Sequence, residues 1–251
     1  MLYLIGLGLS KNDISLKAVE TSKNCEIYIE RYTGYITDDS VRYLSDLLKK
    51  EINLLSRPSL EENSKELIQK ARQKDIALFV EGDPLIATTH KILFIDAKKQ
   101  NVKIKIIHSS SIITAAIGES GLDFYRFGAI CTIARWTDHY KPISFYETIV
   151  KNINLNYHSL ILLDFDEIQQ TSISLKQIVE ILKNAENHYK KNIFSSKKRI
   201  LVMHNIGLDD QIKKLIALSD AENLDLNKGP TLIIVPAELS EIEEEIINSI
   251  N

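Results

Sequence analysis

Short apolar runs of strand length alternate with amphipathic helical stretches along almost the whole of this 251-residue chain. The first run is Leu2–Leu7. Similar strand-length runs, with apolar residues at helical spacing between them, recur at 26–30, 52–55, 76–80, 102–107, 129–133, 159–163, 199–204 and 231–235. This β-α-β-α order is typical of a mostly parallel sheet covered by helices on both faces. It predicts an α/β fold.

The pattern changes after Gly118 and then resumes, which indicates two domains. The length corresponds to about 1.7 domains of ordinary size. Residues 119–136 carry two glycines and several aromatic residues, and strand and helix signals alternate again beyond them. We therefore expect two α/β domains, 1–120 and 121–251, with mostly parallel or mixed sheets. No Pro/Gly-rich linker separates them, so the sequence predicts close packing with a cleft between the domains. Helices are expected, among other places, at 60–73, 88–99, 209–218 and 238–250.

Composition narrows the class of protein. Hydrophobic residues make up 44% and charged residues 26%, with a net charge of −3, which excludes a disordered chain and argues against a dedicated nucleic-acid binder. Cys25 and Cys131 lack disulfide-framework or metal-ligand spacing. No apolar stretch reaches the ~18 residues of a membrane span, and the N-terminus looks like a strand rather than a secretory leader. The expectation is a cytoplasmic protein without a bound metal.

The first strand ends in a glycine-containing loop, Gly6-Leu7-Gly8-Leu9-Ser10. Glycines allow a sharp turn and a close approach to a ligand. The dinucleotide-binding fingerprint needs a third glycine where this chain has Lys11, and the Gly-Lys-Ser/Thr end of a phosphate-binding loop is absent. A plain turn and a ligand-binding loop both fit this segment.

A more informative loop follows the apolar strand at 76–80, with the sequence EGDPLIATTH over residues 81–90, hereafter the GDP loop. Open α/β sheets bind ligands at the carboxyl ends of their strands. Asp83 either caps this turn or holds the polar end of a small ligand. Thr88 or Thr89 is a suitable N-cap for the next helix.

Three serines, 109–111, follow the next strand, and one of them would suffice as a helix cap. The spare hydroxyls favour ligand contact at Ser111 and Ile112. By contrast, His108, His158 and His204 are interpreted as structural histidines at strand ends. The acidic run 238–245 is interpreted as the solvated face of a helix.

Several of these strings together resemble the diphthine synthase family: MLYLIGLGL, GDPLIATTH, the SSSI helix start, GLDFYRFG, WTD and HSLILLD. This family belongs to the two-domain methyltransferases that also methylate tetrapyrroles, and the resemblance covers almost the whole chain, most densely residues 1–165. It implies a tetrapyrrole-methylase-like homodimer that binds S-adenosylmethionine (SAM) in the cleft and releases S-adenosylhomocysteine. It also implies a protein substrate, translation elongation factor 2, with no membrane or direct nucleic-acid partner. The implied reaction methylates the amino group of a 3-amino-3-carboxypropyl group carried by one histidine of that factor.

The resemblance also implies which residues contact SAM. Matched motif by motif, they are Leu9, Asp83, Ile86, Ser111, Ile112, Leu163, Ile206 and Thr231. The family usually has Ala-Arg at positions 204–205 and often His at 231, so His204, Asn205 and Thr231 depart from its pattern. No catalytic base is assigned, because desolvation of the accepting amine would by itself lower the pKa of that amine.

Two other functions stay open at this point. The first is a methyltransferase of the same fold acting on a tetrapyrrole, whose carboxylates call for arginines; the positive charge here is mostly lysine. The second is a non-catalytic nucleotide-sensing scaffold, which would not need Asp83.

Overall fold

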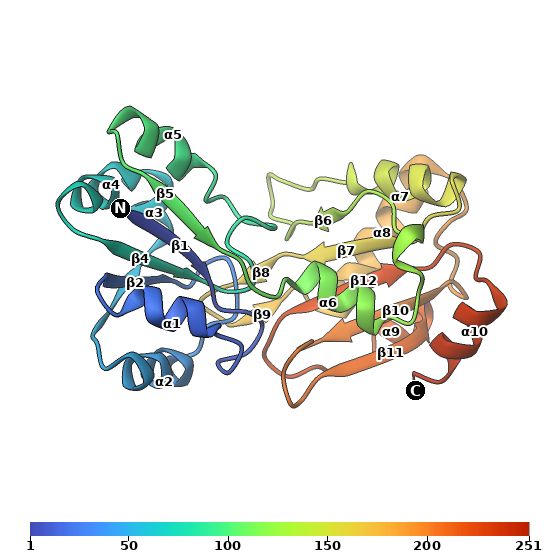
Figure 1. The fold of residues 1–251 in the computed structure, drawn as a ribbon. Coiled ribbons are helices and arrows are strands. Elements are labelled where there is room, and N and C mark those ends of the chain that lie inside the picture. Colours follow the sequence, from blue (N-terminus) through green and yellow to red (C-terminus); the bar gives the residue numbers. More distant parts are fainter. Residues whose placement is uncertain (251) are drawn as a thin grey trace. The chain divides into compact units, whose positions relative to one another are not determined.

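The computed structural model describes residues 1–250, which form two compact units. The first unit is Met1–Ile112, and the second begins at Ile113 (Figure 1). The boundary expected near residue 120 falls at the end of α6 (Ile112–Glu119), inside the second unit. Within the described residues, no helix is long and apolar enough to cross a membrane.

The first unit is built on a parallel sheet in the order β3-β2-β4-β1-β5. Its strands are β1 (Leu2–Gly6), β2 (Glu26–Glu30), β3 (Ile52–Leu55), β4 (Ile76–Val80) and β5 (Ile104–Ile107). All five residues of the central strand β4 are buried. A strand covered on both faces reads as a continuous apolar run, which explains why the sequence signal for β4 was clear.

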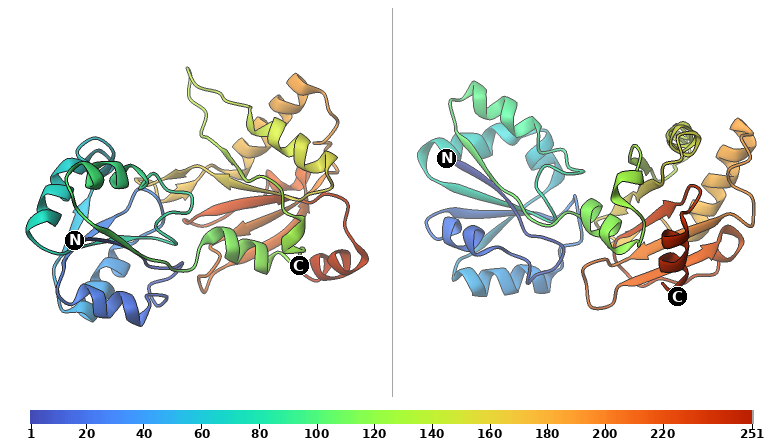
Figure 2. Two further views of the ribbon diagram at one scale, coloured as in Figure 1. Left: turned by 45° about the horizontal axis from the view of Figure 1, so that its top comes forward. Right: turned by 45° about the vertical axis from the view of Figure 1, so that its right-hand side comes forward.

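Helices cover both faces of this sheet (Figures 1 and 2). They are α1 (Leu16–Ser22) and α2 (Asp38–Leu48) on one face, and α3 (Arg57–Glu61), α4 (Ser64–Gln73) and α5 (Ile92–Lys99) on the other. Leu44 of α2 packs into one buried core, whereas Leu67 and Ile68 of α4 pack into a second core across the sheet. The N-cap side chains of Ser15 and Thr37 start α1 and α2. The α/β class is confirmed.

The second unit contains a mixed sheet in the order β11-β10-β12-β7-β6. Its strands are β6 (Cys131–Ile133), β7 (Ser159–Leu163), β10 (Arg199–His204), β11 (Ile212–Ala217) and β12 (Thr231–Val235). Only the β6–β7 pair is parallel among these neighbours. A small antiparallel pair, β8 (Phe165–Asp166) and β9 (Thr171–Ser172), stands apart from this sheet.

The helices of the second unit are α6, the 3-10 turn η1 (Phe124–Arg126), α7 (Phe145–Asn154), α8 (Leu175–Tyr189), α9 (Leu218–Ala221) and α10 (Glu241–Asn248). Helices α7, α8 and α9 contribute to one large core, in which Tyr146 is fully buried. Figure 2 shows α6 and α10 on the opposite side of the sheet from α7 and α8. The N-cap of α8, Ser174, forms a reciprocal capping box with Gln177.

The prediction of a helix at 209–218 is wrong, because residues Ile212–Ala217 of this segment form the edge strand β11. Its apolar residues fall at helical spacing, but every residue from Ile212 to Ala217 is in register with a residue of β10. Pairing with a neighbouring strand therefore overrides the local pattern.

Two other expected helices differ in their limits. The segment expected to form one helix at 60–73 contains the end of α3 and the whole of α4. The first helix ends at Glu61, because the Pro58 carbonyl accepts from the N–H groups of both Glu62 and Asn63. The helix expected at 88–99 begins only at Ile92, and its N-cap is Lys91 rather than Thr88 or Thr89.

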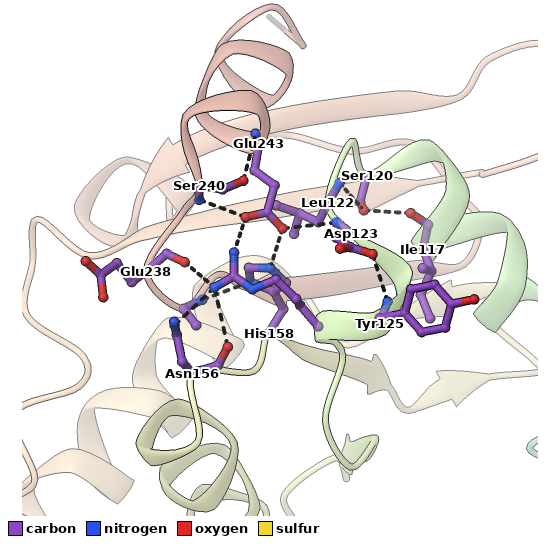
Figure 3. A network of polar contacts seen from close by, with 12 residues as sticks. Ile117, Ser120, Leu122, Asp123, Tyr125, Asn156, His158, Glu238, Ser240 and Glu243 are labelled. Atoms are coloured by element: carbon purple, nitrogen blue, oxygen red, sulfur yellow. Dashed lines mark hydrogen bonds and ion pairs between the residues drawn. The ribbon is translucent and has the colours of Figure 1, made fainter.

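The acidic run 238–245 is not only a solvated helix face. Glu243 is 3% exposed and lies in a polar network, where it accepts from the N–H of Asp123 and pairs with Arg126 and His158 (Figure 3). Burial alone would raise the pKa of Glu243, but backbone hydrogen bonds from Ser240 and Asp123 and the contact with His158 lower it to about 2. Glu243 thus ties α10 to the segment that precedes β6.

Candidate functional site

The loops that follow β4, β1 and β5 lie next to one another, because these three strands are neighbours in a parallel sheet. Gly8 and Gly82 form an isolated bridge between the first two loops. The N–H of Gly82 donates to the Gly8 carbonyl (2.8 Å), and the N–H of Gly8 donates to the Gly82 carbonyl (3.3 Å). These two hydrogen bonds join the loops at the carboxyl edge of the sheet, where α/β folds bind ligands.

Because Gly6 has no side chain, the loop after β5 also packs closely against the loops after β1 and β4. A Cβ placed on Gly6 would lie 2.5 Å from the carbonyl oxygen of Gly82 and 2.8 Å from the Cβ of Ser109. Only a residue without a side chain fits between these groups. Gly6 is thus the point on which the loops after β1, β4 and β5 converge.

Asp83 joins the GDP loop to the loop after β5. Its Oδ2 lies 2.7 Å from Nδ1 of His108, and its Oδ1 accepts from the N–H of Leu85 (3.0 Å). The Asp83 residue is buried at 6% exposure, whereas the His108 side chain is largely exposed. Each carboxylate oxygen keeps one further acceptor position, so Asp83 can hold a donor of a ligand while it fixes the loop.

Asp13 shapes the first loop, and the sequence reading missed it. The N–H groups of Leu9 and Ser10 both donate to its Oδ2, at 3.0 and 2.9 Å. The usable signal was an aspartate three residues after a serine in a glycine-containing loop, a spacing at which a carboxylate can accept from the backbone of its own turn.

The structure places the eight predicted SAM contacts in two groups, one in each unit. In the first unit, Leu9, Asp83, Ile86, Ser111 and Ile112 lie in the converging loops or at the start of α6. In the second unit, the sheet register places Leu163, at the end of β7, at the same edge as Thr231, at the start of β12. Ile206 follows β10 and is buried.

His204 lies beside Thr231 on the neighbouring strand, and its Nδ1 is 2.9 Å from the Thr231 hydroxyl. Both residues are buried, and burial lowers the pKa of His204. Two of the three positions that depart from the family pattern, His204 and Thr231, are therefore in direct contact with each other.

Two acidic residues with buried carboxyl oxygens lie at the start of the GDP loop and on the neighbouring strand, and the sequence analysis identified neither. Glu30 ends β2 and Glu81 directly follows β4, on neighbouring strands. Oε2 of Glu81 is buried without a hydrogen-bond partner among residues 1–250. Burial, with a contribution from the charge of Glu30, raises the pKa of Glu81 to about 8. Glu81 is therefore protonated at neutral pH.

This protonation makes the stability of the first unit pH-dependent. The unfolded Glu81 ionises near its ordinary pKa of 4.5, whereas the folded one keeps its proton to about 8. Between these values the native state binds more protons than the unfolded state, so stability falls as pH rises. Amide hydrogen exchange in β4, followed from pH 5 to pH 8 and corrected for the intrinsic rate, should show a decreasing free energy of opening.

The Glu81→Gln variant should flatten this decrease, because the amide resembles the protonated carboxyl and does not titrate. Glu66→Gln is the matched control, since Glu66 is exposed on α4. A decrease of equal slope in wild type and Glu81→Gln would contradict the assignment.

Comparison with known proteins identifies the family of this chain. The model of the tetrapyrrole (corrin/porphyrin) methylases matches residues 1–221. The chain belongs to the tetrapyrrole methylase family. Among the members of this family, the chain is 34% identical to a diphthine synthase of Methanothermobacter thermautotrophicus over 249 residues, covering 98% of this chain and 94% of that protein.

Two further relatives also match over nearly the full length of both chains. A diphthine methyl ester synthase of Schizosaccharomyces pombe is 32% identical, with coverage of 99% of this chain and 94% of that protein. A crystal structure described as a putative diphthine synthase from Entamoeba histolytica superposes with a TM-score of 0.89 at 28% identity, covering 100% of this chain and 98% of that one. The tetrapyrrole-methylase-like fold and the resemblance to diphthine synthases are confirmed, and family membership makes this chain a methyltransferase.

Proposed function

We propose that this chain is a SAM-dependent methyltransferase of diphthamide biosynthesis. Its substrate would be the amino group of the 3-amino-3-carboxypropyl side chain on a histidine of translation elongation factor 2. Diphthine synthases that match nearly the full length of the chain support this proposal. The observation that carries it is the convergence of three strand-end loops on Gly6, with the buried carboxylate of Asp83 beside them.

The residues at this edge suit the donor groups of SAM. Asp83 keeps one acceptor position on each oxygen, which matches an ammonium group or ribose hydroxyls. Leu9 and Ile86 provide apolar surface in the same loops, and Ile86 is 45% exposed and thus accessible. The proposed contacts are those assigned from the sequence: Leu9, Asp83, Ile86, Ser111, Ile112, Leu163, Ile206 and Thr231. All eight contacts are predictions, five of them in the first unit and three in the second.

The chemistry asks little of the protein beyond alignment. Bound SAM supplies a methyl group that its sulfonium already activates for displacement. The converging loops would hold the donor in line with the accepting nitrogen, and this alignment lowers the barrier without a covalent intermediate on the enzyme. Apolar side chains such as Ile86 would exclude water and lower the pKa of the accepting amine, so that it binds without its proton.

Assembly and location complete the proposal. We infer a cytoplasmic homodimer, in keeping with the free cysteines Cys25 and Cys131 and with the family resemblance. Among residues 1–250, no three His, Cys, Asp or Glu side chains are placed to hold a metal ion. The molar mass of the purified protein by light scattering tests the dimer.

The function is tested by incubating unmethylated elongation factor 2, carrying the 3-amino-3-carboxypropyl group, with this protein and SAM. Mass spectrometry should show a gain of one or more methyl groups on the modified histidine. The Asp83→Ala variant should bind SAM about 10–100-fold more weakly in calorimetry, because it loses hydrogen bonds to a charged group worth about 1.5–3 kcal/mol. Asp46→Ala, which removes an exposed carboxylate on α2, is the matched control.

Other results would select another function. Methyl transfer to a tetrapyrrole but not to the elongation factor would assign the other substrate class of the family. No heat with SAM, or equal heat with Asp83→Ala, would favour a non-catalytic scaffold. Alkaline treatment of the product separates a labile methyl ester from methyl groups on nitrogen, a distinction that the names of the relatives raise.

A further inference from the structure

The GDP loop is held in a conformation that its sequence disfavours. Between β4 and α5 the chain runs through residues 81–91 without helix, and Ala87 has a φ of +57°. A residue with a side chain at positive φ costs about 1 kcal/mol or more, and such strain persists only where the surrounding structure imposes it. The contacts that impose it must lie close to Ala87.

The side chains of Thr88 and His90, which follow Ala87, both contact the carbonyl oxygen of Pro84, which precedes it. The Thr88 hydroxyl donates to the Pro84 carbonyl at 2.8 Å, and Nδ1 of His90 lies 3.2 Å from the same oxygen. A carbonyl oxygen has two acceptor positions, so it can take both. The pair closes the loop across Ala87, directly after Asp83.

The surroundings of His90 determine where its proton sits. The ring is 1% exposed, and burial lowers its pKa, so it is neutral. Its Nε2 has no hydrogen-bond partner in residues 1–250, and the nearest charged atom, Oε1 of Glu30, is 3.8 Å away. Only Nδ1 lies within hydrogen-bond distance of an acceptor, and a carbonyl cannot donate. The neutral ring therefore carries its proton on Nδ1.

We propose that His90 is a positioning residue, which holds the GDP loop in its SAM-binding shape through an Nδ1–H hydrogen bond to the Pro84 carbonyl. The role of the loop in SAM binding rests on the proposed function. An edge-on contact with the ring of Tyr32, at 6.2 Å between ring centres, helps to keep the imidazole oriented. His90 acts through Pro84 and does not itself contact the ligand.

Three substitutions separate a hydrogen-bonding role from simple filling of space. An asparagine amide can place an N–H near the position of Nδ1, whereas a glutamine amide places it near that of Nε2. SAM affinity by calorimetry should stay within roughly threefold of wild type in His90→Asn. It should fall at least about tenfold in His90→Gln and His90→Ala. If His90→Asn binds as weakly as His90→Ala, or if all variants bind like wild type, the proposal is overturned.

Relief of the strain at Ala87 provides a second readout. Glycine adopts positive φ without strain, so Ala87→Gly added to His90→Ala should restore part of the lost affinity. A ring that only filled a cavity would not be replaced by this change. Thermal unfolding of each variant shows which samples are folded at the temperature of the binding experiment.

The tautomer is tested on the wild-type protein without ligand. Nitrogen-15 NMR of labelled histidine, assigned by comparison with His90→Asn, should show the proton on Nδ1. A proton on Nε2 would overturn the proposal even if every variant is unstable. If wild type does not bind SAM, the proposed function fails, whereas the NMR result still decides the hydrogen bond to Pro84.

Discussion

Replacing Gly6 with alanine should weaken SAM binding at least about tenfold, which corresponds to ~1.4 kcal/mol. The added Cβ would lie 2.5 Å from the Gly82 carbonyl oxygen and 2.8 Å from the Cβ of Ser109. Neither group is the far end of a flexible side chain, so the loops themselves must separate. Overpacking of this kind also costs about 1–3 kcal/mol of stability. Calorimetry with SAM and thermal unfolding measure the two effects separately.

Gly118→Ala is the matched control for this change. Gly118 lies inside α6, and a Cβ there meets nothing within 4 Å. Alanine favours a helix over glycine by about 1 kcal/mol, so this variant should be slightly more stable and should bind SAM as wild type does. Unchanged SAM affinity in Gly6→Ala would mean that the converging loops do not form the binding site.

Replacing Glu243 with alanine should lower the free energy of unfolding of the second unit by about 3–5 kcal/mol. The carboxylate is buried and bonded to the backbone of Asp123 and to the side chains of Arg126 and His158 (Figure 3). Its loss leaves the guanidinium of Arg126 without its buried counter-charge. The effect is therefore larger than that of removing a surface ion pair, which is worth ~1 kcal/mol or less.

The chain carries a convenient probe for this measurement. Its single tryptophan, Trp136, packs against the core of the second unit, so its fluorescence during urea unfolding reports on that unit. Glu244→Ala, a change of the exposed neighbour on the same helix turn, should alter stability by no more than about 0.5 kcal/mol. An equal effect of the two variants would show that the network in Figure 3 contributes nothing to stability.

The low pKa of Glu243 predicts that the second unit loses stability at acid pH. The pKa of this carboxyl is about 2 in the folded protein against an ordinary 4.5, so its stabilising contribution is complete above about pH 4.5 and is lost as pH falls toward 2. Wild type should therefore lose stability across this range by a larger amount than Glu243→Ala does. Parallel pH dependences would contradict the assignment.

Strands that are buried on both faces could be predicted to the residue. The limits of β4, β7, β10 and β12, in which nearly every residue is buried, agree with the apolar runs in the sequence. Each run is a local signal, because a strand covered on both sides needs apolar residues at successive positions whatever its neighbours are. Helix starts were less accurate. Before α5, Thr88 and His90 contact the Pro84 carbonyl and Thr89 donates to Glu61, so neither threonine caps the helix.

Some features of the candidate site could likewise be predicted from the local sequence, and others could not. The glycines at 6, 8 and 82 and the acidic Asp83 could be found from the sequence, because tight turns at strand ends demand particular residue types. Their mutual contacts could not, because Gly8 and Gly82 are 74 positions apart and meet only when β1 and β4 pair. Glu81 gave no signal for the same reason, because the burial that raises its pKa, and the smaller contribution from Glu30 on the neighbouring strand, arise only on folding.

By itself, then, the sequence determined the α/β class, the strands of both sheets except β11, the loops that end β1, β4 and β5, and the resemblance to a methyltransferase family. Tertiary structure alone decided that 212–217 is a strand, that Glu243 is buried against residues about 120 positions earlier, and that His90 faces the Pro84 carbonyl. The physical reason is that apolar periodicity and turn chemistry are written along the chain. Strand pairing, burial of a charge and the partner of a polar atom depend on residues that only folding brings together.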